Sequence, residues 1–82
     1  MNHDDNRPAG DDWLAALLQS LRSDERVESI SESRQEGLSI YRIEAREVPA
    51  APWGGPRCYV SRHDTRGGVR RMLAQIGIEV RQ

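Results

Sequence analysis

Two helical patterns, one near each end of the chain, limit most strongly how this sequence can fold. The first spans about residues 12–22 and places five apolar side chains on one face: Trp13, Leu14, Leu17, Leu18 and Leu21. Asp11 or Asp12 stands where an N-cap side chain can accept hydrogen bonds from the first turn. We expect this face, Trp13 included, to pack in the core.

The second pattern follows residue 65 and repeats apolar residues at i, i+3, i+4 and i+7: Val69, Met72, Leu73 and Ile76. Asp64 or Thr65 is expected to cap this helix, and Gly77 to end it in a left-handed conformation. Ile78 stands where such a helix end usually makes a hydrophobic contact back to the last turn.

The residues between the helices carry strand patterns over 26–33, 38–48 and 57–63. In the second segment Leu38 and Ile40 share one phase and Tyr41, Ile43 and Ala45 the other, which predicts either a bulge or a strand partly covered on both faces. In the third, Cys58 and Val60 alternate with Tyr59 and Ser61. A turn at residues 35–37 and a proline- and glycine-rich loop at 49–56 separate the strands.

The expected fold is therefore α+β, in the order α-β-β-β-α, with a three-stranded antiparallel sheet and both helices packed on one face. A chain of 82 residues supports one core, so we expect a single domain over residues 11–82 after a disordered leader at 1–10. The leader has no signal-peptide pattern, and the lone Cys58 fits a reducing, cytoplasmic setting. We expect no cofactor and no metal site.

Charge is divided unevenly along the chain. Residues 1–36 carry four arginines and nine acids, a balance of −5, whereas residues 37–82 carry eight arginines and four acids, a balance of +4. One interpretation is that the fold presents an acidic face and a basic face, each able to attract a partner. The other is that the two halves neutralise each other within the fold.

Four of the arginines gather near the second helix and form a candidate anion or nucleic-acid site: Arg62, Arg66, Arg70 and Arg71. Helical spacing places Arg66 and Arg70 on one flank and Arg71 elsewhere. Gly67 and Gly68 in the first turn would let a backbone or a phosphate approach. The alternative is that these arginines pair with the acids of residues 1–36.

Aromatic residues form a second candidate site, for a protein partner. Trp53 lies among prolines and glycines, so it either covers the core or anchors a partner. Tyr41 and Tyr59 could form a platform on the sheet beside it. The only candidate for catalysis is His63 next to Asp64, with Ser61, Thr65 or Cys58 as nucleophile, and sequence proximity alone does not orient such a group.

The element order and the run Thr65–Ile78 resemble the double-stranded-RNA-binding-like fold and, more narrowly, the HicA family of mRNA-cleaving toxins. That resemblance implies that Arg66, Arg70 and Arg71 take the place of phosphate-binding lysines. The family's catalytic histidine lies on the second strand, and residues 37–42 here contain no histidine. The resemblance therefore implies an RNA binder without nuclease activity, unless His63 serves.

These observations favour a non-catalytic binding module, an inhibitor or accessory regulator of the kind that phages and mobile elements encode, such as an anti-CRISPR protein. Its expected partner is a protein or a ribonucleoprotein. A homodimer is also expected, because a three-stranded sheet covered on one side leaves one face and two edges open. The alternative is a HicA-like RNA-binding protein or ribonuclease.

Overall fold

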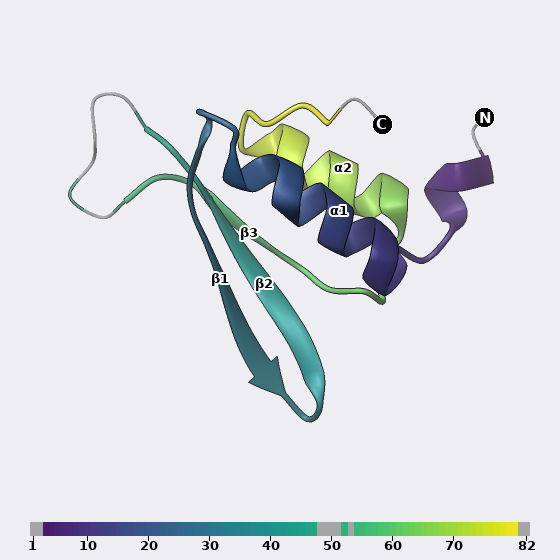
Figure 1. Cartoon of the computed structure of the whole chain (residues 1–82). Helices are drawn as coiled ribbons and strands as arrows, with labels where there is room; N and C mark the ends of the chain where they lie inside the picture. The colour runs from purple at the N-terminus through teal and green to yellow at the C-terminus, as the bar shows by residue number, and fades with distance from the viewer. Residues whose placement is uncertain (1–2, 48–51, 53, 81–82) are drawn as a thin grey trace.

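The computed structural model describes residues 3–47, 52 and 54–80. Along the chain they form the 3-10 helix η1 (His3–Asn6), α1 (Gly10–Arg22), β1 (Val27–Gln35), β2 (Leu38–Ala45), β3 (Arg57–Val60) and α2 (Arg66–Gln75). The strands form one antiparallel sheet in the order β1-β2-β3, and both long helices lie over the same face of it (Figure 1). The expected α+β fold and its α-β-β-β-α order are confirmed.

The β1–β2 hairpin closes with a tight two-residue turn. Gln35 pairs with Leu38, and the residues between them, Glu36 and Gly37, have φ angles of 53° and 80°. Two positive φ angles define a type I′ turn, whose twist matches that of the flanking strands. The turn end of the hairpin extends beyond the helices (Figure 1).

The phase change expected in the second strand reflects apolar side chains on both faces of β2. β1 carries the register shift, between Val27 and Ser29, and β2 is continuous. β2 is half-covered at Leu38 and Ile40 on one face and buried at Ile43 and Ala45 on the other. Of the two expected explanations, coverage on both faces describes β2, and the bulge belongs to β1.

The core lies between the helices and one face of the sheet. Its fully buried side chains come from every long element except β1: Leu17, Ile43, Val60, Val69, Leu73 and Ile78. Cys58 and Val60 of β3 point into this core while Arg57 and Tyr59 are exposed, as the alternation predicts. α1 presents its leucine face to the core, with Trp13 half-buried at the margin.

Both ends of α2 follow the expected capping chemistry. The Thr65 hydroxyl accepts a hydrogen bond from the amide of Gly68 at 3.0 Å. At the other end Gly77 has a φ of 87°, and the amides of Gly77 and Ile78 donate to the carbonyls of Ala74 and Leu73 at 3.0 and 2.9 Å. These two bonds make a Schellman motif, and the buried Ile78 supplies its hydrophobic contact.

Two expected boundaries differ from the structure. α1 begins at Gly10, and its N-cap residue Ala9 makes no side-chain capping bond, so Asp11 and Asp12 lie inside the first turn instead of capping it. There they still face the positive end of the helix dipole. β3 ends at Val60 rather than at residue 63, because residues 61–64 form a turn.

Residues 3–9 are folded against α2, in contrast to the disordered leader expected at residues 1–10, of which the first two lie outside the described residues. The amide of Arg66 donates to the carbonyl of Arg7 at 2.9 Å, and the amide of Ala9 donates to that of Asp64 at 2.7 Å. Pro8 and Thr65 form an isolated antiparallel bridge. Ala9 is only 1% exposed, so the core begins just after η1.

Candidate binding surfaces

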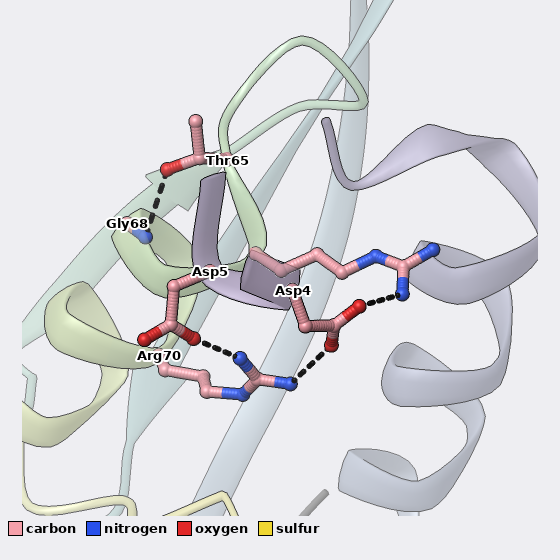
Figure 2. A network of polar contacts seen from close by, with 6 residues as sticks. Asp4, Asp5, Thr65, Gly68 and Arg70 are labelled. Carbon is pink, nitrogen blue, oxygen red and sulfur yellow. Dashed lines mark hydrogen bonds and ion pairs between the residues drawn. The ribbon is translucent and has the colours of Figure 1, made fainter. Parts of the chain in front are cut away.

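Arg66 and Arg70 lie on the same flank of α2, as expected, and both form ion pairs with carboxylates of η1. Arg66 donates to Asp4 at 2.8 Å, and Arg70 bridges both acids, at 2.6 Å to Asp5 and 3.4 Å to Asp4. Figure 2 shows the Arg70 guanidinium lying between the two carboxylates. We call these four residues, Asp4, Asp5, Arg66 and Arg70, the η1 clasp.

The ring of Trp13, on α1, lies against the two arginines of the η1 clasp. The guanidinium carbons of Arg66 and Arg70 lie 5.4 and 5.5 Å from the centroid of its ring, within the range of cation–π attraction. The same ring packs against the core. Trp13 thus packs against the core, as expected, and also contacts both of the arginines that bind Asp4 and Asp5.

Gly67 makes room for η1. A Cβ atom on Gly67 would lie 2.8 Å from the Cβ of Asp5 and 3.1 Å from its carbonyl oxygen, closer than carbon atoms pack. The absence of a side chain was expected to admit a backbone or a phosphate at this point, and the group that approaches is the chain's own Asp5. Gly68 has a different role, since its amide donates to the Thr65 cap.

The ion pairs of the clasp join the acidic half of the chain to its basic half. Arg62 adds a further pair of this kind, its Nη1 lying 3.6 Å from a carboxylate oxygen of Asp11. Arg71, the fourth residue of the candidate anion site, is exposed and makes no ion pair with the residues described. Of the two interpretations of the uneven charge, mutual neutralisation therefore describes Arg62, Arg66 and Arg70.

The face of the sheet turned away from the helices forms a second surface. We call it the open sheet face; β2 and β3 contribute Leu38, Ile40, Arg42, Glu44, Arg57 and Tyr59 to it. Tyr59 is 55% exposed and is the one large hydrophobic side chain so exposed among the residues described. Arg42 lies between Ser31 and Tyr59 in the register.

Arg42 is held on this face with an unused hydrogen-bond donor. Its side chain is half-buried, and its Nε is shielded from solvent with no hydrogen-bond partner among the residues described. Neighbouring Glu44 accepts hydrogen bonds from Ser29 and from the amide of Gly55, at 3.3 and 3.2 Å. The Nε atoms of Arg66 and Arg70 are shielded and unpaired in the same way, so what sets Arg42 apart is its place beside the exposed Tyr59.

The structure does not bring the three candidate aromatic residues together. Tyr41 pairs with Val60 and packs on the helix side, whereas Tyr59 pairs with Arg42 on the open sheet face. The expected platform of two tyrosines is therefore wrong, because residues of opposite phase point to opposite faces of a sheet. Trp53 lies outside the described residues.

His63 lies in an exposed turn. Its amide donates to the hydroxyl of Ser61 at 3.3 Å, and the carboxylate of Asp64 accepts from the amide of Ser61 at 2.7 Å. No hydrogen bond links the side chains of His63 and Asp64 in the described part of the chain.

Cys58 is buried in the core, where desolvation raises the pKa of its thiol. Within the described ranges no group of metal-binding side chains is found.

Comparison with known proteins adds no relative: no family model, curated protein or solved structure matches this chain. The described helices are all too short or too polar to cross a membrane. The case for a function therefore rests on the two surfaces.

Proposed function

We propose that this chain is a non-catalytic binding module and that the open sheet face binds a protein partner. The observation that carries the proposal is the exposure of Tyr59 beside Arg42 on the face of the sheet opposite α1 and α2. Tyrosine and arginine are the residues most enriched where protein interfaces concentrate their binding energy.

The chemistry of the face indicates the partner. Tyr59 offers an aromatic surface with a hydroxyl, and Arg42 offers the positive charge of a half-buried guanidinium. A partner that places an apolar side chain on Tyr59 and a carboxylate on Arg42 would satisfy both. A protein with an acidic rim around an apolar contact fits this surface, whether it is free or part of a ribonucleoprotein.

The η1 clasp supports a protein partner over RNA. A strong phosphate site needs unpaired cations, since affinity for nucleic acid grows with the number of phosphates neutralised. Arg66 and Arg70 already hold carboxylates at hydrogen-bonding distance, and Arg62 lies near another. RNA would have to displace Asp4 and Asp5 before it could reach them.

A small binding module that blocks or modulates a larger protein is an inhibitor or accessory regulator, the class to which anti-CRISPR proteins belong. The proposal for this chain is a role of that class. It is supported by the single small core and by the lack, among the described residues, of a hydrogen bond from the His63 side chain to Ser61 or Asp64.

The test compares variants in quantitative capture of proteins from the source cell, followed by affinity measurement with the purified partner. Tyr59→Ala and Arg42→Ala should each weaken binding of the same protein at least tenfold, whereas Arg22→Ala and Gln19→Ala on exposed positions of α1 should leave it unchanged. Circular dichroism confirms that the variants fold. Loss of binding in the α1 controls, or no dependence on Tyr59 and Arg42, would refute the proposal.

A second measurement separates protein from RNA. Binding of a structured RNA is followed by fluorescence anisotropy over a series of salt concentrations. Tight binding with a steep salt dependence, lost in Arg66→Ala and Arg70→Ala, would replace the protein-binding proposal with the RNA-binding alternative.

A further inference from the structure

We propose that two copies of this chain pair through the outer edge of β1, antiparallel and centred on Ser33, to form a continuous six-stranded sheet. This inference does not depend on the proposed function, because β1 and β3, which carries Tyr59, form opposite edges of the sheet. It begins from the strand order β1-β2-β3, in which no strand of the described residues pairs with the outer edge of β1.

The outer half of β1 is unusually accessible for a strand. Residues 31–35 are all exposed, and the hairpin that contains them extends beyond the helices (Figure 1). Proteins usually protect a long edge with proline, lysine or a covering segment. In β1 the bulge lies at the other end, between Val27 and Ser29, and the outer part from Ile30 to Gln35 is in regular register with β2.

The backbone of this segment is prepared for a partner strand. In an antiparallel ladder, alternate residues of an edge strand direct both their N–H and C=O groups outward. Counting from Gln35, which pairs with Leu38 across the turn, the outward residues are Arg34, Glu32 and Ile30. A second strand that places its own outward residues opposite these can exchange hydrogen bonds with them.

The charges of β1 select one way of pairing. If two copies are centred on Ser33, Glu32 of each copy lies opposite Arg34 of the other, and these are the residues whose backbone groups point outward. Both side chains project from the same face of the sheet, as cross-strand pairing requires. Neither Glu32 nor Arg34 forms an ion pair within the described part of its own chain, although the Glu32 carboxylate accepts from Ser39 at 2.5 Å.

Neighbouring registers are less favourable. Centring on Glu32 or on Arg34 places like charges directly opposite each other, which destabilises a strand pair. Centring on Ser31 places Ile30 opposite Glu32 and brings the outer end of one strand to the bulge of the other. The sequence Glu-Ser-Arg at residues 32–34 thus favours pairing of two identical strands, because opposite charges face each other. A single charged residue on the edge would instead face its own copy and oppose association.

The geometry of the pair follows from its two-fold axis, which passes perpendicular to the sheet at Ser33. Both helical layers then lie on one side of the six-stranded sheet, and both open sheet faces lie on the other. The two Tyr59 side chains stand toward the outer edges of this enlarged face. The dimer would offer two equivalent surfaces to its partners.

Charge exchange tests the proposal. Light scattering during size-exclusion chromatography should give the wild type a mass twice the 9.3 kDa of one chain at concentrations approaching about 1 mM. Glu32→Arg and Arg34→Glu should each be monomeric, and an equimolar mixture of the two should restore the dimer, because every facing pair is again of opposite charge. Glu25→Arg, at an exposed position before β1 and outside the facing pairs, is the matched control and should remain dimeric.

A crosslink provides an independent readout of the register. Facing residues at the two-fold axis have Cα atoms within the range of a disulfide, so Ser33→Cys should form an interchain disulfide on mild oxidation. Ser29→Cys on the same strand should not. A monomeric wild type, a dimer indifferent to both charge changes, or a mixture that fails to associate would overturn the proposal.

Discussion

Gly67 is the residue on which the docking of η1 depends. In an ordinary helix alanine is more favourable than glycine by up to about 1 kcal/mol. Here the added Cβ would lie 2.8 Å from the Cβ of Asp5, so Gly67→Ala should lower the free energy of unfolding and displace η1. Urea denaturation measures the first effect, and the loss of protection of the Arg66 amide in hydrogen exchange measures the second.

The sign of the effect depends on η1, which supplies the control. In a chain that lacks residues 1–6 the contact with Asp5 is gone, and Gly67→Ala should be neutral or stabilising. A stabilising effect of Gly67→Ala in the full chain would show that η1 does not occupy this position.

Asp24 links stability to pH. Its carboxylate accepts hydrogen bonds from the Arg26 guanidinium and amide, which lower its pKa from 3.8 to about 2. A carboxyl group with a lowered pKa in the folded state stabilises that state. Its contribution is complete above the pKa that the group has in the unfolded chain, and it is lost as the pH falls to the pKa that the group has in the folded protein. The contribution of Asp24 should therefore be present above about pH 4 and disappear between pH 4 and pH 2.

Denaturation of Asp24→Asn across that range provides the measurement. The variant should be less stable than the wild type at pH 5, and the difference should close as the pH approaches 2. The effect is small because the pair is well solvated. Glu25→Gln removes the adjacent exposed charge as a control, and a difference for Asp24→Asn that is constant with pH would argue against the ion pair.

At the scale of elements, η1 and α2 are held together by charge as much as by packing. Asp4→Asn with Asp5→Asn removes both carboxylate charges that meet Arg66 and Arg70. Partly exposed ion pairs contribute from a few tenths to about 1 kcal/mol each, so we expect a loss near 1 kcal/mol for the double variant. The loss should shrink in high salt, because salt screens such pairs.

Urea denaturation at low and high salt measures this loss. Glu25→Gln with Glu36→Gln is the matched control, since it removes two exposed carboxylates that have no ion pair among the described residues. An equal loss in the control, or one insensitive to salt, would mean that the clasp charges do not stabilise η1.

The elements differ in how far the sequence reveals them. α2 could be predicted in detail because its signals are local. Thr65 caps its first turn, and the adjacent residues Gly77 and Ile78 close its last turn. The η1 clasp could not, because Asp4 and Arg66 are 62 positions apart and a short acidic segment has no periodicity of its own. Only the surplus of acids near one end and arginines near the other hinted at their pairing.

The open sheet face could be predicted in part from the alternation of residues along the strands. Cys58 and Val60 were assigned to one side of their strand, which already places Tyr59 on the other, and Tyr41 shares its phase with the buried Ile43. Alternation alone therefore separates the two tyrosines. Register was the missing information, since it is the pairing of Tyr59 with Arg42 that places an aromatic ring beside an unpaired donor.

For the whole molecule, the opposite charges of the two halves of the chain partly pair with each other. Arginines of the second half are joined to acids of the first, so the arginine-rich helix presents less positive charge than its sequence implies. Wild-type protein should bind structured RNA weakly and with a shallow salt dependence. Asp4→Asn with Asp5→Asn frees Arg66 and Arg70 and should bind more tightly and with a steeper dependence, as anisotropy titrations can show.

Site-specific photo-crosslinking in the source cell tests the central claim most directly, because it compares the two surfaces in one measurement. A photoreactive phenylalanine derivative, which keeps the aromatic ring, replaces Tyr59 on the open sheet face in one sample and the exposed Arg71 on α2 in another. The account predicts that residue 59 crosslinks to a discrete protein that residue 71 does not reach. Crosslinking of RNA from residue 71, with no protein captured from residue 59, would contradict it.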